Sequence, residues 1–311
     1  MKKNFFLLVT AFAIAFGIVG CNSKEATNMR ETVENQKTDT TDTESSSTEM
    51  PEYGVEEGFS KKKADVTYGE QIKISYESKT TETTRKANVI LPAGYSEDKK
   101  YPVLYLLHGI GGDQNEWLGG NPKVLVGNLI AKGEAEEMII VMPNVRARAN
   151  DAANPSDIYS VEHFRAFDNF INDLKNDLMP YIEANYSVAT GRENTAIAGL
   201  SMGGRESLFI GLSMPETFGY VGAFCPAPGV LPYNVEGGLF ETDDFKLAEG
   251  YHSLIMIVKG NNDTVVGAWP ETYSNALTKN GTDHIFYTTT GGHDFVVWKN
   301  GLYNFVKLIF K

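Results

Sequence analysis

The sequence has few cysteines, fewer basic than acidic residues, and an N-terminal apolar run too short for a membrane-spanning helix. It holds two cysteines in 311 residues, which excludes a disulfide framework. Its 28 Lys and Arg are outnumbered by 40 Asp and Glu, and no basic cluster suggests a nucleic-acid partner. Its N-terminal apolar run, residues 5–18, is about 14 residues long, whereas a membrane-spanning helix needs about 20. The composition, 42% hydrophobic, is instead ample for a sizeable folded core.

The N-terminus begins with Lys2 and Lys3 and continues into this apolar run, which is the pattern of an export signal. The run ends in Ile-Val-Gly-Cys at residues 18–21, which resembles a bacterial lipobox. We therefore expect residues 1–21 to be a lipoprotein signal peptide and Cys21 to carry the lipid. The protein would then be anchored to the outer face of the bacterial cell membrane. The alternatives are an ordinary secretory signal, which would give a secreted protein, and a short anchor, with Cys21 incidental in both.

The next segment, residues 22–60, is rich in Ser and Thr and carries ten acidic residues against three basic ones. Such a composition buries too little apolar surface to offset chain entropy, so we expect a disordered, flexible tether. The folded domain is expected to span residues 61–311. Cys225 is the remaining cysteine, and we expect it to be a small buried side chain.

Short apolar runs alternate with helical stretches along this domain, which predicts an α/β fold with a mainly parallel sheet. The expected strands are an N-terminal antiparallel pair, 71–76 and 86–92, then 101–109, 138–144, 194–200, 254–260 and a weaker one at 284–290. The expected helices include 161–186, with Ser160 as its N-cap, and 300–310.

Residues 199–203 read Gly-Leu-Ser-Met-Gly, between an expected strand and an expected helix. This context is the one in which a G-x-S-x-G motif forms the nucleophile turn of an α/β-hydrolase. The turn is sharp, so side chains at the flanking glycine positions would collide with neighbouring backbone. Ser201 is therefore the expected nucleophile, and the N–H of Met202 an expected oxyanion donor.

A serine hydroxyl needs a base and an acid, which in this fold follow it on loops after later strands. His293 follows the last expected strand on a glycine-flanked loop, so it is the expected base. Asp263 follows the strand at 254–260 and is the expected acid. Four other aspartates are weaker candidates for the acid: Asp243, Asp244, Asp283 and Asp294.

The second oxyanion donor is expected from the His-Gly loop at residues 107–117, with Ile110 as the first candidate and Gly111 next. His108 is then expected to hold this loop rather than to transfer protons. Candidates for an aromatic acyl pocket are Trp117, Tyr159, Phe295 and Trp298, and the alternative for each is plain core packing. No cluster has metal-ligand spacing, and no metal or cofactor is expected.

With these residues in place, the chain resembles carbohydrate esterase family 1, specifically bacterial feruloyl esterase modules of the esterase D-like α/β-hydrolases. The likeness covers residues 65–311 and rests most strongly on GLSMGG and GGHDFVVW. It implies Ser201 as nucleophile, His293 as base and Asp263 as acid. Residues 145–160 and the stretch between Pro226 and His252 depart from the family pattern.

The resemblance implies a serine esterase that removes feruloyl groups from plant cell-wall xylan through an acyl-enzyme. One alternative is an acetyl-xylan or general short-chain esterase, because the same site residues would serve it. The alternative from another class is a glycan-binding surface lipoprotein without catalysis. Retention of Ser201, Asp263, His293 and the His-Gly loop argues against a pure binder.

Overall fold

The computed structural model describes residues 52–233 and 238–311. The expected signal peptide, Cys21 and most of the expected tether therefore lie outside the described residues. Across the described ranges, none of the helices combines the length and apolarity needed to cross a bilayer.

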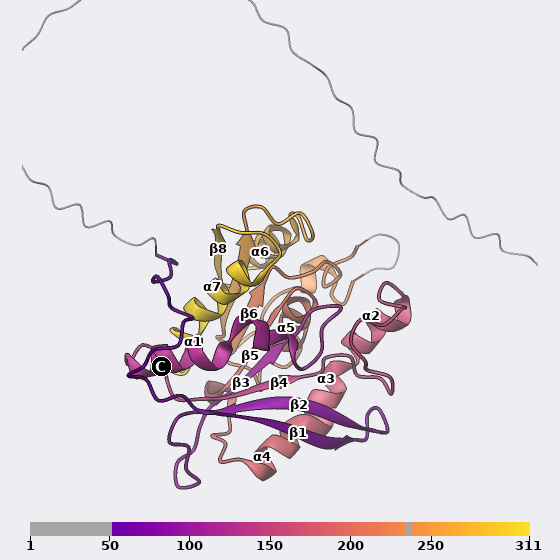
Figure 1. Ribbon diagram of the computed structural model, residues 1–311. Coiled ribbons are helices and arrows are strands. Elements are labelled where there is room, and N and C mark those ends of the chain that lie inside the picture. The colour runs from indigo at the N-terminus through magenta and orange to yellow at the C-terminus, as the bar shows by residue number, and fades with distance from the viewer. Residues whose placement is uncertain (1–51, 234–237) are drawn as a thin grey trace, which may run out of the picture. The chain divides into compact units, whose positions relative to one another are not determined.

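An eight-stranded sheet runs through the domain in the order β1-β2-β4-β3-β5-β6-β7-β8 (Figure 1). β1 pairs antiparallel with β2, β2 pairs antiparallel with β4, and the other neighbours are parallel. The strand bounds are β1 (Glu70–Ser78), β2 (Thr83–Leu91), β3 (Val103–Leu107), β4 (Ile139–Pro143), β5 (Thr195–Leu200), β6 (Tyr220–Phe224), β7 (Leu254–Gly260) and β8 (Ile285–Thr289). The expected mainly parallel sheet with an N-terminal antiparallel pair is confirmed.

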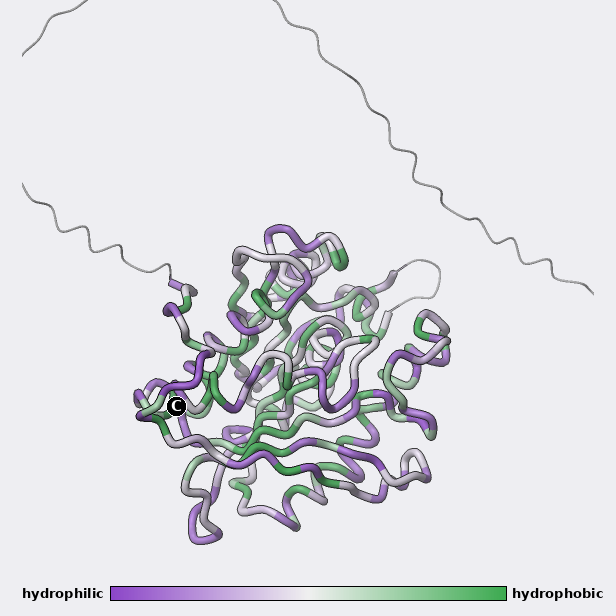
Figure 2. Tube along the Cα trace, in the orientation of Figure 1, coloured by the Kyte–Doolittle hydropathy of each residue, from purple (hydrophilic) through white to green (hydrophobic). Residues whose placement is uncertain are grey.

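The central strands are apolar throughout because both faces of the sheet are covered. Every residue of β3, β4 and β5 is buried, and these strands lie in the hydrophobic interior of the trace (Figure 2). Each expected strand is present within a few residues. One strand was missed, β6, whose short run Tyr-Val-Gly-Ala-Phe is interrupted by Gly222 and has too few apolar residues to stand out.

The two faces of the sheet can be distinguished at β6. A Cβ on Gly211 of α5 (Met202–Ser213) would meet the side chain of Val221, whereas a Cβ on Gly301 of α7 (Phe295–Val306) would meet the ring of Phe224. Successive side chains of a strand point to opposite faces of the sheet. Val221 and Phe224 are three residues apart, so α5 and α7 lie on opposite faces of the sheet. The sheet is thus the middle layer of an α/β/α sandwich.

The helices cover these faces with bounds that differ from the predicted ones at two places. They are α1 (Pro122–Ala131), α2 (Val161–Asp168), α3 (Phe170–Asp173), α4 (Met179–Asn185), α5 (Met202–Ser213), α6 (Trp269–Lys279) and α7 (Phe295–Val306). The expected helix 161–186 is present as α2–α4, with a π-helical turn at 174–178.

Two helix starts are fixed by side-chain caps. Ser160 caps α2 by accepting the N–H of His163 at 3.1 Å, as predicted. The last helix begins five residues before the predicted start, because Asp294 accepts the N–H of Val296 at 2.8 Å and caps α7 there. This early start places α7 directly after His293.

The domain begins before the predicted residue 61. The ring of Tyr53 stacks on Tyr287 with centroids 4.3 Å apart, and Phe59 packs edge-on against Tyr303 at 5.2 Å. The interpretation of residues 22–60 as one flexible tether is therefore wrong for 52–60. Two aromatic anchors in an otherwise acidic stretch are enough to fix it to the domain.

We expect a chain truncated to residues 61–311 to be less stable than one that begins at Glu52. Removing the packing of two aromatic rings should lower the free energy of unfolding by about 1–3 kcal/mol. The melting temperature should then fall by roughly 2–4 °C for each kcal/mol, measured by circular dichroism. A chain that begins at Asn22 should have the same melting temperature as the chain that begins at Glu52. Equal melting temperatures of all three chains would show that Tyr53 and Phe59 contribute nothing to the stability of the domain.

Candidate active site

Ser201 lies on a tight turn between β5 and α5 in a backbone conformation that few side chains adopt. Its φ is +53° and its ψ is −119°, a combination found where surrounding structure imposes it. Ser201 N–H is bonded to the Phe224 carbonyl and its own carbonyl accepts the N–H of Ala227, both at 3.0 Å. These bonds to the end of β6 and the loop beyond it hold the turn.

The glycines around Ser201 are required by close approach of backbone to backbone. A Cβ on Gly203 would lie 2.3 Å from the Leu107 carbonyl oxygen of β3. A Cβ on Gly199 would lie 2.4 Å from the Gly203 carbonyl. Only glycine fits at either position, so α5 can start directly against the end of β3.

Ser201, His293 and Asp263 form a continuous chain of hydrogen bonds. His293 Nε2 lies 2.9 Å from Ser201 Oγ, and His293 Nδ1 lies 2.8 Å from Asp263 Oδ2. The three residues follow β5, β8 and β7, whose carboxyl ends meet at one edge of the sheet. The structure thus brings the three predicted residues together over sequence separations of 92 and 30 residues.

The carboxyl group of Asp263 is held on both oxygens. Its Oδ1 accepts the backbone N–H groups of Val265 and Val266 at 2.9 and 3.2 Å, while Oδ2 faces His293. Burial alone would raise the pKa of Asp263, but the hydrogen bonds from His293 and from backbone lower it, and the net shift of the pKa is downward. Asp263 is thus an ionised acceptor that fixes the proton of His293 on Nδ1.

Other aspartates considered from the sequence are engaged elsewhere. Asp294 caps α7, and Asp243 pairs with Lys279 at 2.9 Å. The hydrogen bond to His293 Nδ1 comes from Asp263 on the loop after β7, as expected for the acid.

Cys225 lies beside the acid, which the sequence did not indicate. It is fully buried, as expected, but has a φ of +49°. One polar atom from each of Cys225, Asp263 and His293 lies within 4.8 Å of the others. Both ring nitrogens of His293 already take part in hydrogen bonds, so this cluster belongs to the Ser201 chain and is not a free set of metal ligands. Burial raises the pKa of the Cys225 thiol, which stays protonated.

Two expected oxyanion donors lie next to the nucleophile. Met202 is the first residue of α5, where a helix leaves its N–H groups without intrahelical acceptors. On the other side, the loop after β3 passes so close that a Cβ on Gly109 would lie 3.3 Å from Ser201 Cβ. Ile110 follows on this loop, and its carbonyl accepts His163 Nε2 at 2.9 Å.

His108 holds this loop. Its Nε2 accepts the N–H of Val145 at 2.8 Å, so the ring proton is on Nδ1 and is donated to the Gly109 carbonyl at 2.7 Å. Burial lowers the pKa of His108 to about 3, which keeps the ring neutral. The expectation of a loop-holding histidine agrees with this geometry.

The four candidate aromatic residues occupy different environments. Trp117 is 1% exposed and donates its indole N–H to the Leu107 carbonyl, so it is core and has no surface for a substrate. Trp298 packs edge-on against His293, with centroids 5.2 Å apart, and Phe295 packs against Trp298 at 5.0 Å. Tyr159 is 81% exposed. The structure therefore removes Trp117 from the expected pocket and leaves Tyr159 on the open surface.

The unusual loop 145–160 is braced by arginines and lies over the Ile110 loop. Arg146 is fully buried and donates to the carbonyls of Asp151 and Ala152 at 2.9 and 3.0 Å. Farther along the loop, the N–H of Asn154 bonds the Gly111 carbonyl at 3.0 Å. One of the two segments that depart from the family pattern thus contacts the expected oxyanion loop directly.

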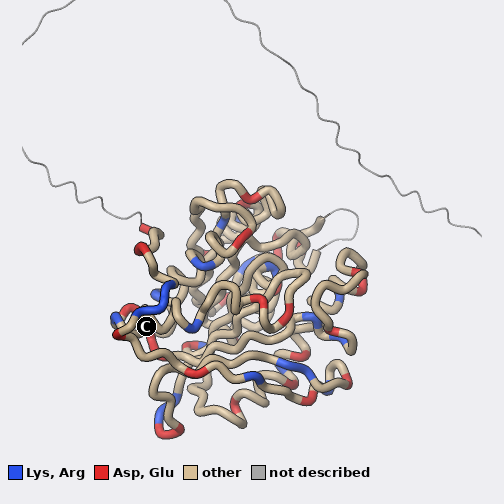
Figure 3. Tube along the Cα trace, in the orientation of Figure 1, with Lys and Arg blue, Asp and Glu red and all other residues tan. Residues whose placement is uncertain are grey.

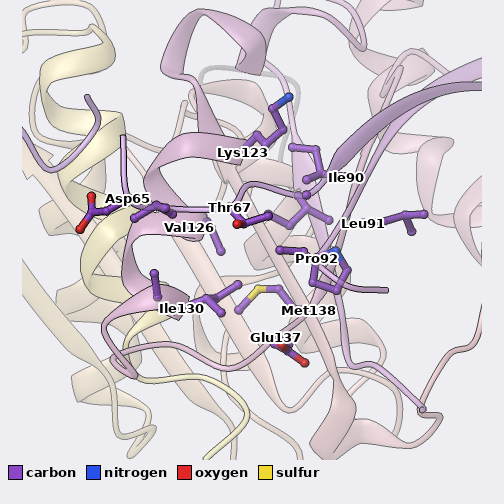
Figure 4. Close-up of a pocket in the computed structure, with 16 residues that line it drawn as sticks. Asp65, Thr67, Ile90, Leu91, Pro92, Lys123, Val126, Ile130, Glu137 and Met138 are labelled. Carbon is purple, nitrogen blue, oxygen red and sulfur yellow. The ribbon is translucent and has the colours of Figure 1, made fainter. Parts of the chain in front are cut away.

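A separate hollow of about 320 Å³ lies away from these residues, between β2, β4 and α1 (Figure 4). Its wall is mainly aliphatic, with Lys123, Asp65 and Glu137 among its polar members. None of Ser201, His293 or Asp263 lines it. Basic and acidic residues are interspersed along the trace of the domain (Figure 3).

A mainly parallel sheet defines an α/β-hydrolase when a strained serine between strand and helix is hydrogen-bonded to a histidine, which is in turn bonded to an aspartate, both from later loops. Comparison with known sequences agrees: the profile of the Esterase family matches residues 78–308. The chain therefore belongs to the Esterase family, and the domain described here is a carboxylic ester hydrolase.

Three relatives show how close the similarity is. A solved CE1 ferulic acid esterase from Anaeromyces mucronatus, in complex with ferulic acid, is 42% identical, with a TM-score of 0.78, and the match covers 84% of this chain and 98% of that one. The endo-1,4-beta-xylanase/feruloyl esterase of Xylanibacter ruminicola is 30% identical over 258 residues, 79% of this chain. An acetyl esterase of Caldicellulosiruptor saccharolyticus is 24% identical over 76% of this chain and 85% of that protein. The expected resemblance to family 1 feruloyl esterases and the expected fold are confirmed.

The chain spans 32% of the length of the Xylanibacter ruminicola protein. The similarity thus concerns one part of that larger protein.

We expect Gly203→Ala to impair both stability and ester hydrolysis. Its Cβ would meet the Leu107 carbonyl at 2.3 Å, so α5 must shift and carry Ser201 with it. The free energy of unfolding should fall by about 1–3 kcal/mol in urea, and turnover of 4-nitrophenyl acetate by roughly 10²-fold or more.

Ser213→Ala, at the exposed last residue of the same helix, is the matched control. Wild-type turnover in Gly203→Ala would show that the turn tolerates a side chain.

Proposed function

We propose that this protein is a serine esterase that hydrolyses feruloyl and related hydroxycinnamoyl esters on plant cell-wall xylan. The single observation that carries the chemistry is the hydrogen-bonded chain Ser201–His293–Asp263. The choice of acyl group is supported by the 42% identity to a ferulic acid esterase that was solved with ferulic acid.

In this mechanism Ser201 Oγ attacks the ester carbonyl while His293 Nε2 takes its proton. Asp263 accepts the Nδ1 proton of the ring and stabilises the imidazolium that forms. The N–H groups of Met202 and Ile110 would bind the oxygen that becomes negative. His293 then gives its proton to the departing sugar hydroxyl, which leaves an acyl-enzyme. A water molecule, activated by the same histidine, releases the acid and restores Ser201.

A second candidate is hydrolysis of acetyl esters on xylan or of other short-chain esters. It is favoured by the similarity to an acetyl esterase and by the burial of Trp117, which removes one aromatic residue from the expected pocket. Membership of an esterase family speaks against a glycan-binding lipoprotein that lacks catalysis.

The decisive measurement is the initial rate of the protein lacking residues 1–21 on methyl ferulate and on acetylated xylan. We expect ferulate release that falls roughly 10⁴-fold or more in Ser201→Ala. Acetate release without ferulate release would move the assignment to the second candidate. An active wild type with an equally active Ser201→Ala would contradict the serine mechanism. A wild type that is inactive on both substrates would favour the binding protein.

We further propose that residues 1–21 direct export and that Cys21 is lipidated, which would hold the domain at the outer face of the cell membrane. The support is the basic start, the apolar run and the cysteine that ends it. An anchored esterase would act on polymer or oligosaccharide fragments outside the cell.

Cells fed a radiolabelled fatty acid should label the protein, and Cys21→Ser should abolish the label. Cys225→Ala is the matched control, because these are the chain's two cysteines, and it should keep the label. Absence of label in the wild type would refute the anchor and leave an ordinary secretory signal. Label that survives in Cys21→Ser would contradict lipidation at Cys21.

A further inference from the structure

Gly109, directly after β3 and His108, is held by side chains on both of its amide groups. Its N–H donates to Glu116 Oε2 at 2.6 Å. Its carbonyl accepts the Nδ1 proton of His108 at 2.7 Å. We name this arrangement of His108 and Glu116 around Gly109 the Gly109 clamp.

The two side chains of the clamp are themselves fixed. His108 is 1% exposed and accepts the N–H of Val145 on its other nitrogen, so the ring cannot turn without losing both bonds. The Glu116 carboxylate has room beside this loop because Gly112 has no side chain: a Cβ there would lie 2.2 Å from Glu116 Oε2. The glycines of the His-Gly loop thus make room for a carboxylate.

The clamp determines the direction of the next N–H group. The peptide between Gly109 and Ile110 is planar and trans, so its carbonyl and its N–H point in opposite directions. Fixing the Gly109 carbonyl on His108 therefore fixes the Ile110 N–H. A carbonyl that accepts a hydrogen bond also polarises its own peptide, which strengthens the N–H as a donor.

The clamped residue also lies directly against the nucleophile. A Cβ on Gly109 would be 3.0 Å from Leu200 Cδ1 and 3.3 Å from Ser201 Cβ. Small displacements of Gly109 would therefore change the distance between Ser201 and the Ile110 N–H. Catalytic hydrogen bonds to a developing oxyanion depend on such pre-organisation.

We infer that His108 and Glu116 are positioning residues that hold the Ile110 N–H in place as an oxyanion donor. The inference rests on the proposed serine mechanism and adds two residues to it. Neither side chain has to touch the substrate. What Glu116 supplies is an acceptor oxygen at a fixed place, and its negative charge is not needed.

The test compares Glu116→Leu, which removes the acceptor, with Glu116→Gln, which keeps an amide oxygen there. With 4-nitrophenyl acetate and the full chain, Glu116→Leu should lower kcat roughly 10- to 10²-fold with KM within about threefold. Glu116→Gln should stay within about fivefold of wild type. Asp113→Asn is the control in the same loop, because its carboxylate bonds only the neighbouring Asn115 among the described residues.

A second measurement separates positioning from general damage. Phenylboronic acid forms a tetrahedral adduct with a nucleophilic serine and thus reports on the oxyanion site. Its inhibition constant should rise in Glu116→Leu by about the same factor as kcat/KM falls, while the melting temperature decides whether the variant is folded. If Glu116→Leu does not fold, the comparison is made with His108→Asn, which keeps a donor, and His108→Leu, which does not.

Wild-type kcat in folded Glu116→Leu, or in His108→Leu, would overturn the inference. So would a lower kcat with an unchanged inhibition constant for phenylboronic acid. Failure of the serine mechanism itself gives a different result, because Ser201→Ala would then be as active as the wild type.

Discussion

The close approach of α5 to the end of β3 is the constraint on which the site depends. Gly203 packs against the Leu107 carbonyl with no room for a Cβ, and this contact places the first turn of α5 beside the loop that carries Gly109. Ser201 is then forced into a φ of +53°. The backbone strain at Ser201 is offset by the packing of α5 against the sheet. This packing keeps the Ser201 hydroxyl in a single position.

The remaining members of the site reach Ser201 because the sheet is parallel in this region. Loops that follow β7 and β8 come out at the same edge as the serine turn. His293 is fixed on three sides, by Ser201, by Asp263 and by the edge of Trp298. The cap of α7 at Asp294 begins the helix directly after it, which limits how far the imidazole can move.

Loop 145–160 is internally braced by Arg146 and bonded to Gly111 through Asn154. A change in this loop would thus be transmitted to the loop that carries Ile110, an expected oxyanion donor. The residues Ser201, His293 and Asp263 do not by themselves decide which acyl group an enzyme of this fold releases.

The sequence by itself determined the class of fold and the three residues of the hydrogen-bonded chain, because Gly199, Ser201 and Gly203 follow a local rule of backbone geometry and the later loops follow chain order. It did not determine where the domain begins, because Tyr53 and Phe59 are bound by aromatic partners more than 200 residues away. It could not show that Trp117 is core. The position of Cys225 beside Asp263 and the bond from Gly109 to Glu116 are likewise visible only in three dimensions, because tertiary packing creates both contacts.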